Sequence, residues 1–492
     1  MSATERWGIH EVVLSGPREG NPFLEVTLAA VFRHGHREVR VEGFYDGEGT
    51  YRIRFLPDEE GAWEYVTESG APALAGKTGS FLCTPALRGN HGPVGVARTF
   101  HFVHADGTPH VPIGTTCYAW NHQGDALEER TLATLRASPF NKMRMCVFPK
   151  HYLYNENEPP LHAFEKGADG SWDFTRFVPA FFRRLERRVG DLRDMGIQAD
   201  LILFHPYDRW GYADMGAEAD DRYLRYLVAR LSAYRNVWWS FANEYDLMKG
   251  KSTADWDRLF RLVASRDPYS HPRSIHNCRG FYDHAKPWVT HASVQHEDLV
   301  RVTEWRAAYG KPVVVDECCY EGNIHRAWGN ITAREMTRRI WEGTVRGGYV
   351  GHGETFVDPG DVLWWSKGGT LHGQSPERIA FLKSVLEAMP GPHEYTDRFT
   401  ARYPALQCGD GDAFLIYLGD RQPVRMELAL PSGRPYRAEI LDTWQMTVRA
   451  VEGPVRAVTP GAGTKAPPDS VPGAAVMDLP GKPYMAIRLT AV

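Results

Sequence analysis

Residues 237–244 read Val-Trp-Trp-Ser-Phe-Ala-Asn-Glu, an apolar run of strand length that ends in a carboxamide and a carboxylate. Residues 311–317 read Lys-Pro-Val-Val-Val-Asp-Glu and have the same form. Continuous apolar runs of this length are typical of parallel strands that are buried on both faces. Each run therefore predicts a buried strand with a glutamate, Glu244 or Glu317, at its carboxyl end.

The pattern around these two runs repeats from about residue 97 to residue 391. We expect eight strands, at Val111–Thr115, Lys142–Phe148, Ala199–Leu203, Val237–Ala242, Ser274–His276, Val289–Ser293, Pro312–Asp316 and Tyr349–His352. Amphipathic segments lie between them, for example Ala126–Ala137, Phe177–Met195, Ala217–Leu231, Thr253–Arg266, Leu299–Tyr309 and Thr332–Arg346, and Pro376–Ala388 would be the last. Eight strand–helix alternations predict a (β/α)8 barrel, or TIM barrel, with Asn155–Ser171 as a long loop on its active-site face.

Both ends of the chain are patterned differently from the middle. Residues 1–96 contain short alternating or apolar runs separated by turn clusters such as Asp46-Gly-Glu-Gly, and similar runs return after residue 395. Such spacing is typical of β-sandwiches. We expect three domains: a β-sandwich over 1–96, the barrel over 97–394 and a second β-sandwich over 395–492, with the Pro- and Gly-rich segment Gly461–Gly473 as a loop.

Composition excludes several classes of protein. The net charge of −4 gives no reason to expect a nucleic-acid partner, and no run of eighteen apolar residues predicts a membrane span. The N-terminus lacks the pattern of a secretory signal, and the seven cysteines show no CxxC spacing. We therefore expect a cytoplasmic protein with reduced thiols and no membrane partner; a homo-oligomer remains open.

The two glutamates suit glycoside hydrolysis, because they stand at the ends of the fourth and seventh strands and would face one mouth. That reaction needs one protonated carboxyl group, which donates to the leaving oxygen, and one ionised carboxylate, which attacks the anomeric carbon. Repulsion between the two and partial burial separate their pKa values. Asp316 competes with Glu317, but neighbouring strand residues alternate in direction, so only one of them faces the mouth.

The chain resembles the clan A glycoside hydrolases, in which an Asn-Glu pair follows strand four and a second Glu follows strand seven. The wider chain resembles the apiosidase-like barrel family. Its N-terminal motifs, Gly43-Phe-Tyr-Asp-Gly47 and Arg54-Phe-Leu-Pro57 among them, resemble the immunoglobulin-like domain that often precedes such barrels, and its C-terminal part resembles the β-domain that often closes them. The resemblance implies that Glu244 is the acid/base, that Glu317 is the nucleophile and that the anomeric configuration is retained.

Further binding residues follow from the resemblance and from the predicted strand ends. The resemblance implies that Asn243 reaches the sugar 2-hydroxyl and that Arg144 supports the nucleophile. Clan members often carry Trp at the end of strand eight, where this chain has Tyr349-Val-Gly-His-Gly-Glu354. We expect the other substrate-binding side chains to be Trp120, His205, Tyr207, His296, Tyr320, His352, Glu354 and Trp364, with Trp364-Trp365 as the stacking platform.

Two alternatives remain open from the sequence. A metal-dependent hydrolase on the same barrel needs a ligand cluster, but the one His-x-His pair, His34-Gly-His36, lies in the N-terminal β-region. A non-catalytic carbohydrate-binding protein would not need both glutamates. We expect no metal and no cofactor. The resemblance favours an exo-acting enzyme that cleaves a terminal furanose, such as apiose, arabinofuranose or galactofuranose, from an oligosaccharide or glycoside.

Overall fold

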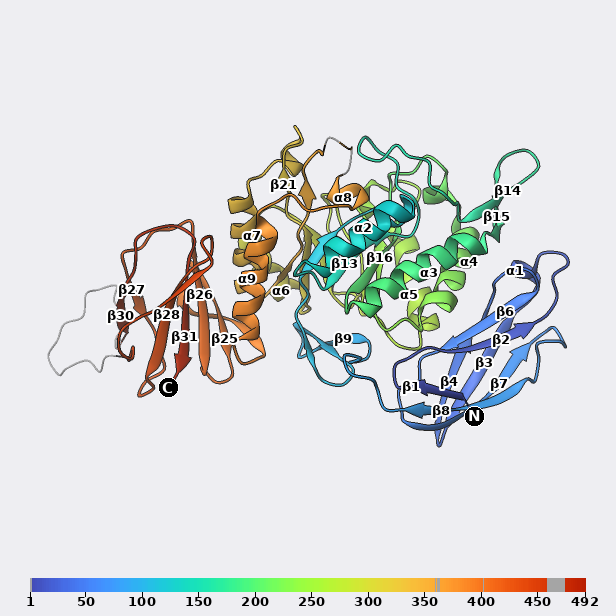
Figure 1. The fold of residues 1–492 in the computed structure, drawn as a ribbon, viewed down its shortest axis with the longest axis horizontal. Helices are drawn as coiled ribbons and strands as arrows, with labels where there is room; N and C mark the ends of the chain where they lie inside the picture. The colour runs from blue at the N-terminus through green and yellow to red at the C-terminus, as the bar shows by residue number, and fades with distance from the viewer. Residues whose placement is uncertain (1, 359, 361–362, 401, 458–473) are drawn as a thin grey trace.

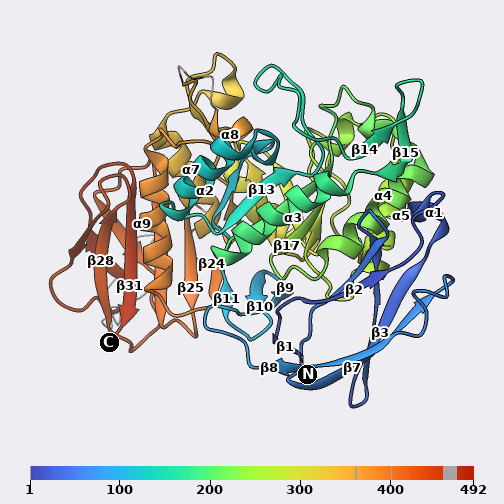
Figure 2. The ribbon, with the colours of Figure 1, turned by 45° about the vertical axis from the view of Figure 1, so that its right-hand side comes forward.

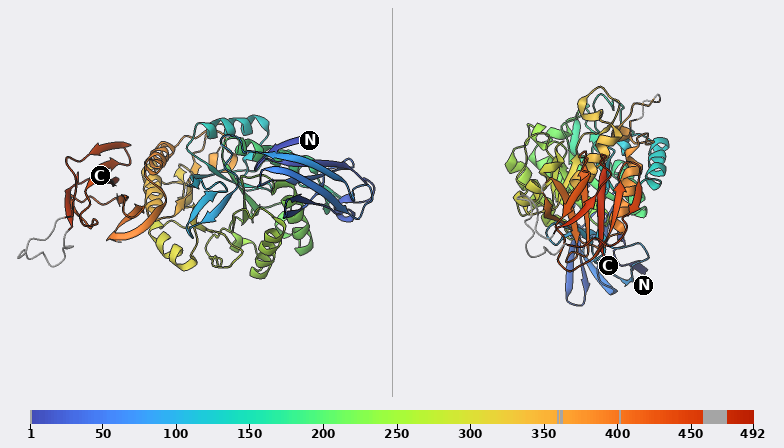
Figure 3. Two further views of the ribbon diagram at one scale, coloured as in Figure 1. Left: turned by 90° about the horizontal axis from the view of Figure 1, so that it is seen from below. Right: turned by 90° about the vertical axis from the view of Figure 1, so that its left-hand side faces the viewer.

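The computed structural model describes residues 2–358, 360, 363–400, 402–457 and 474–492. Strand-rich regions at the two ends of the chain lie on opposite sides of a central region of strands and helices (Figures 1 and 3). The predicted loop Gly461–Gly473 lies outside the described residues. No helix in the described residues is both long enough and apolar enough to cross a membrane.

The N-terminal region contains two sheets around one core. The first has the strand order β1-β8-β7-β3-β4 and the second the order β2-β6-β5. Side chains from both sheets, Phe32 and Trp63 from the first and Phe55 from the second, are fully buried in a common cluster. The elements are β1 (Ser2–Glu5), β2 (His10–Ser15), α1 (Pro22–Glu25), β3 (Leu28–His34), β4 (Arg37–Glu42), β5 (Phe44–Tyr45), β6 (Thr50–Phe55), β7 (Gly61–Ser69) and β8 (Thr78–Thr84).

A small antiparallel sheet connects this region to the centre. It is formed by β9 (Val94–Ala97), β10 (His101–His104) and β11 (Pro109–His110), and it lies beneath the central strands (Figure 2). The ring of Phe102 packs 4.7 Å from Trp238 and 5.3 Å from Tyr349. The domain boundary expected at residue 96 therefore falls within a strand that pairs with the residues after it.

The central strands are parallel and TIM-barrel-like in arrangement. One sheet has the order β12-β13-β16-β17-β18 and another the order β19-β20-β22. Isolated parallel bridges, His276 with Ser293 and Thr115 with His352, join the two sheets, so the pairings form a closed circuit. The strands are β12 (Gly114–Thr116), β13 (Lys142–Cys146), β16 (Gln198–Phe204), β17 (Val237–Ala242), β18 (Arg273–Ser274), β19 (Ala292–Gln295), β20 (Val313–Glu317) and β22 (Tyr349–Val350).

Helices follow all but one of these strands. They are α2 (Asp125–Arg136), α3 (Pro179–Asp194), α4 (Ala217–Leu231), α5 (Thr253–Arg266), α6 (Val302–Tyr309), α7 (Ala333–Val345), the short α8 (Trp364–Lys367) and α9 (Ser375–Glu387). The alternation expected from the sequence fails once: residues 275–291, all described, connect β18 to β19 without a helix. The predicted loop Asn155–Ser171 contains β14 (Phe164–Lys166), which pairs with β15 (Trp172–Phe177). A two-stranded sheet of β21 (Glu321–Gly322) and β23 (Glu354–Thr355) lies beside α8.

The C-terminal region packs on α7 and α9. Its main sheet has the order β24-β25-β26-β31-β28-β29, and β27 pairs with β30. Trp341 of α7 stacks 5.5 Å from Tyr417 of β26, which joins this sheet to the central core. The strands are β24 (His393–Thr400), β25 (Tyr403–Cys408), β26 (Ala413–Gly419), β27 (Arg425–Leu428), β28 (Tyr436–Asp442), β29 (Thr447–Ala450), β30 (Ala475–Asp478) and β31 (Met485–Ala491).

Buried ion pairs join the N-terminal region to the centre. Arg230 of α4 is fully buried and donates to Asp46 Oδ1 at 2.9 Å and to Glu186 Oε1 of α3 at 2.5 Å. Arg54 of β6 contacts the same Glu186 at 2.8 Å and the carbonyl of Arg230 at 2.8 Å. Charges from both regions thus neutralise one another at the contact, which fixes the N-terminal sheets against α3 and α4.

Candidate active site

The two glutamates lie at the carboxyl ends of parallel strands. Glu244 follows β17 and Glu317 ends β20, and their exposed fractions are 7% and 3%. Glu244 has φ of +51°, in the left-handed region that side chains with a Cβ rarely adopt. Its N–H bonds to His276 Nδ1 at 3.4 Å, and the Nε2 of the same ring lies 3.8 Å from Glu317 Oε1. One imidazole thus contacts both glutamates.

Glu317 is surrounded by hydrogen-bond donors. Arg144 Nη1 of β13 donates to its Oε1 at 3.1 Å, and Trp328 Nε1 donates to its Oε2 at 3.2 Å. The hydroxyl of Tyr118 donates to Oε1 and also lies 3.1 Å from Asn243 Oδ1. These donors leave the carboxylate in one orientation at the mouth of the strands.

Glu244 has a different environment. Its Oε2 accepts from the Tyr207 hydroxyl and from Asn243 Nδ2 at 3.1 Å. Burial and the negative charge of Glu317 raise its pKa, and the Lys150 ammonium and the Tyr207 hydrogen bond partly offset this rise. A carboxyl group of raised pKa beside a carboxylate paired with arginine can perform proton donation and nucleophilic attack in one site.

Asp316 is separated from this pair. Its Oδ1 lies 3.0 Å from Lys142 Nζ and its Oδ2 accepts from Ser293 Oγ at 2.5 Å. Lys142 in turn pairs with Asp200 at 2.5 Å. These side chains, all of them buried, form a polar core among the strands, so Asp316 is engaged in structure.

Four of the expected binding residues gather around the carboxylates. Asn243 and Tyr207 contact Glu244, and Arg144 contacts Glu317. Tyr320 is fully buried with its ring 5.5 Å from Trp365, and burial together with the Glu317 charge raises its pKa well above the usual range.

Three expected binding residues at the strand ends instead contact the protein around them. Trp120 is fully buried and donates to Met145 Sδ at 3.4 Å. His205 Nε2 lies 3.2 Å from the carbonyl of Phe148, and burial lowers its pKa to about 3. His296 Nδ1 accepts from the N–H of Asp298 at 3.0 Å. Each of these three side chains thus has a partner within the fold, and its contact with substrate stays a prediction.

The three expected residues after strand eight also have partners within the fold. His352 is stacked 4.8 Å from Phe140, and Trp364 Nε1 donates to Thr115 Oγ1 at 2.9 Å. Glu354 accepts from the N–H groups of His372 and Gly373 at 2.5 and 2.8 Å, so both of its oxygens anchor the segment before α9. Their contact with substrate also stays a prediction. The ring of Trp365, the neighbour of Trp364, lies 5.7 Å from that of Tyr118.

Sequence reasoning missed several side chains of the site. These are Tyr118, Lys150, His276, Cys278 and Trp328. Tyr118 lies two residues beyond β12 and His276 two residues beyond β18, so a search just past each strand end would have found both. Lys150 and Trp328 lie on loops, where no periodicity fixes the direction of a side chain.

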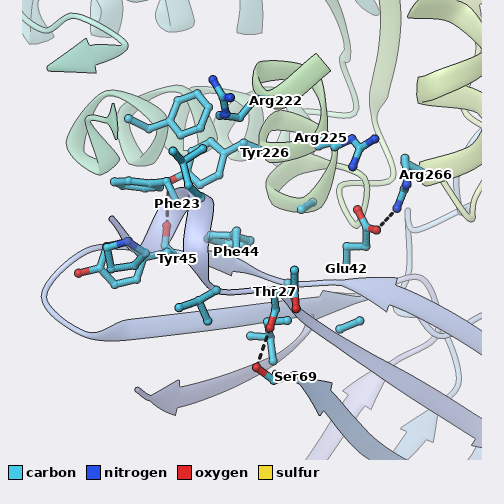
Figure 4. A pocket seen from close by; sticks show the side chains of 18 of the residues that line it. Phe23, Thr27, Glu42, Phe44, Tyr45, Ser69, Arg222, Arg225, Tyr226 and Arg266 are labelled. Atoms are coloured by element: carbon cyan, nitrogen blue, oxygen red, sulfur yellow. Dashed lines mark hydrogen bonds and ion pairs between the residues drawn. The ribbon is translucent and has the colours of Figure 1, made fainter. Parts of the chain in front are cut away.

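Other parts of the described chain offer no better site. No group of three or more His, Cys, Asp or Glu side chains is arranged to hold a metal ion in the described residues. A cavity of about 650 Å³ separates the N-terminal sheets from α4 (Figure 4). Two ion pairs line it: Arg222 with Glu218 at 2.6 Å and Arg266 with Glu42.

Residues 97–366 match the model described as the apiosidase-like catalytic domain. The chain belongs to the apiosidase-like family. Residues 3–70 and 404–490 of this apiosidase-like protein match two domains of unknown function, DUF5060 and DUF5605. The match confirms the family expected from the sequence and the enzyme class, glycosidase.

Solved structures agree with this assignment. The apiosidase-like chain is 38% identical to a candidate glycoside hydrolase from Bacteroides vulgatus, with a TM-score of 0.93 and full coverage of both chains. It also resembles a glycoside hydrolase of family 5 from the same species, with 14% identity and a TM-score of 0.61 over 82% of this chain and 94% of the other. The second likeness shows the fold alone. No curated protein matches the chain.

Proposed function

We propose that this apiosidase-like protein is a retaining glycoside hydrolase that acts by double displacement. In this proposal a (β/α)8 barrel that lacks the helix after β18 covers residues 97–394, between β-sandwich domains over 1–96 and 395–492. The observation that carries the proposal is the contrast between two neighbouring carboxyl groups: Glu317 beside the Arg144 guanidinium, and Glu244 with a raised pKa. That contrast is what separates a nucleophile from an acid/base.

The proposed reaction has two steps. Glu317 attacks the anomeric carbon while Glu244 donates its proton to the leaving oxygen, which gives a covalent glycosyl-enzyme intermediate and the free aglycone. Glu244, now ionised, takes a proton from water, and that water displaces Glu317 from the sugar. Asn243 would bind the sugar 2-hydroxyl. We expect the two carboxyl groups to lie about 5–5.5 Å apart, as a retaining mechanism requires.

We further propose exo-action on a terminal furanose, such as apiose, arabinofuranose or galactofuranose. Aromatic rings border the site on one side: Tyr152 and Tyr154 lie 5.4 and 5.8 Å from Trp365. A mouth closed on one side favours binding of the end of a sugar chain over binding along its length.

The seven cysteines are all unpaired thiols, which supports a reducing, cytoplasmic compartment.

The test begins with a panel of 4-nitrophenyl furanosides and pyranosides and continues with two variants on the best substrate. We expect Glu317→Ala to abolish turnover, because no covalent intermediate can form. Azide should rescue Glu244→Ala with net retention, since azide needs no base. In Glu317→Ala, azide would enter from the side of the missing nucleophile and give the inverted product.

The matched control is Glu218→Ala, which removes an exposed glutamate of α4 and should keep full activity. Azide products of the same configuration from both variants would show that the two roles are wrongly assigned. Failure of the wild-type protein to cleave any glycoside in the panel would contradict the proposed function itself.

A further inference from the structure

Lys150 is a buried lysine in the candidate site without a carboxylate partner. It follows β13 and is 2% exposed, and within the described ranges no carboxylate oxygen lies at ion-pair distance from its Nζ. Lys142, on the same strand, pairs with Asp200 at 2.5 Å and with Asp316 at 3.0 Å. An isolated ammonium is costly to bury, so the position of Lys150 needs an explanation.

Aromatic rings take the place of a counter-ion. Lys150 Nζ lies 3.4 Å from the ring centre of Tyr118, 4.2 Å from that of Tyr207 and 4.6 Å from that of Tyr152. The ring of Trp365 lies 5.6 Å away. The negative face of each ring attracts the ammonium, and several rings together stabilise it where water is scarce.

The two closest rings connect Lys150 to the two glutamates. The hydroxyl of Tyr118 donates to Glu317, and the hydroxyl of Tyr207 donates to Glu244. A cation on the face of a phenol withdraws electron density from the ring and makes its O–H a stronger donor. One ammonium therefore strengthens one hydrogen bond to each carboxyl group.

We propose that Lys150 is a positioning residue whose charge acts, through the rings of Tyr118 and Tyr207, on both catalytic carboxyl groups at once. The inference rests on the proposed function. During the double displacement the negative charge moves from Glu317, which becomes an ester, to Glu244, which becomes the base. A cation that contacts neither carboxylate directly but is coupled to both can stabilise the charge in either place.

Several other charged and titratable groups surround Lys150 and the two glutamates. Those facing Lys150 are Tyr118, Arg144, Cys146, Tyr152, Tyr207, Glu244 and Glu317. Those facing the two glutamates also include His276, Cys278 and Tyr320. Burial lowers the pKa of His276 well below its usual value, so this ring is neutral. Lys150 and Arg144 are therefore the two cations of this set.

Lys150 carries its positive charge below about pH 8. Burial lowers its pKa to about 8, although the nearby Cys146 and glutamate groups act in the opposite direction. Its removal withdraws a positive charge from two carboxyl groups, and that raises the pKa of a carboxyl group. The acidic and the basic limb of the pH profile of kcat/KM should therefore both move to higher pH.

The experiment compares Lys150→Met, Lys150→Arg and the wild-type protein on the best 4-nitrophenyl glycoside of the panel. In Lys150→Met, both limbs of the pH profile of kcat/KM should move upward by about one pH unit. In Lys150→Arg, which keeps the charge, the limbs should stay in place even if the rate falls. A purely structural lysine would lower the rate without moving both limbs.

The matched control is Lys251→Met. Lys251 is also a buried lysine near an aromatic ring, 4.8 Å from Phe204, but it pairs with Asp220 at 2.7 Å away from the two glutamates. This substitution should lower stability and leave both limbs unmoved. If circular dichroism shows that Lys150→Met does not fold, Lys150→Gln replaces it.

A second readout does not depend on turnover. Trp328 donates to Glu317 at 3.2 Å, so its fluorescence should report on the surroundings of that side chain as the pH changes. The signal is the fluorescence of each protein minus the fluorescence of the same protein carrying Trp328→Phe, measured against pH. The midpoint should rise in Lys150→Met but not in Lys150→Arg or Lys251→Met. Unchanged limbs and midpoint in Lys150→Met would overturn the inference. A wild-type protein without turnover refutes the proposed function, while the fluorescence still decides the role of Lys150.

Discussion

Replacing Arg230 with methionine should weaken the attachment of the N-terminal region. Arg230 is fully buried, and the substitution removes its bonds to Asp46 at 2.9 Å, Glu186 at 2.5 Å and the Tyr226 hydroxyl at 2.8 Å. Breaking a buried ion pair from one side costs about 3–5 kcal/mol, because the remaining charge stays buried and unpaired. Arg54 still contacts Glu186 at 2.8 Å, so we expect a loss near the lower limit, about 3 kcal/mol.

The pH dependence of this loss follows from Asp46. Burial alone would raise its pKa, but Arg230, Arg52 and Arg183 outweigh burial, and the folded-state pKa lies below the usual value. A carboxylate of lowered pKa contributes stability above its unfolded pKa of about 3.9, and that contribution is lost as the pH falls through the folded value. The stability difference between wild type and Arg230→Met should therefore be largest near neutral pH and shrink in acid.

Differential scanning calorimetry and limited proteolysis measure the effect. A loss of about 3 kcal/mol confined to a domain of fewer than 100 residues lowers its melting temperature by about 12 °C or more, so the N-terminal region should unfold in a separate, earlier transition. The control is Arg33→Met, whose partner is the exposed Glu38 and whose cost should stay below about 0.5 kcal/mol. A loss below about 1 kcal/mol for Arg230→Met would refute the reasoning that the buried ion pairs hold the two regions together.

Three further outcomes are expected. Tyr207→Phe removes a hydrogen bond that favours the ionised form of Glu244, so the pKa of Glu244 should rise and the basic limb of kcat/KM should move upward, as a pH profile would show. Gly353→Ala places a Cβ 2.0 Å from the ring of Tyr320, so that ring must move; kcat/KM should fall by about tenfold or more while the melting temperature changes by only a few degrees. EDTA should leave the rate unchanged, and a loss that added zinc restores would contradict the metal-free mechanism.

The sequence predicts where the strands end, and with that the positions of Glu244 and Glu317. A parallel strand buried on both faces has to be an unbroken apolar run, and the first polar residues beyond it, Glu244 and Glu317, have to lie at its end. The roles expected of Asn243 and Arg144 came from the family resemblance. Burial and strand pairing are therefore enough to predict the strands and the residues at their ends.

The sequence does not predict contacts that depend on distant parts of the chain. Trp364 and Trp365 are adjacent and identical, and only the direction of the short helix α8 decides that Trp365 faces the site. Glu354 was expected to bind substrate, but the return of the chain at residues 372–373 brings two N–H groups to its oxygens. Lys150 depends on rings from three separate segments, which no spacing within the sequence reveals.

The left-handed backbone of Glu244 has a consequence for the history of the family. Every residue with a Cβ is strained at φ of +51°, by about 1 kcal/mol, and glycine or asparagine bears this conformation most easily. With Glu244 as the proposed acid/base, catalysis requires a glutamate there against the preference of the backbone. In relatives that have lost the substrate, only the backbone strain acts on position 244. We expect glycine or asparagine to replace the glutamate there. Those two residues at this position would mark the inactive members of the family in a sequence alignment.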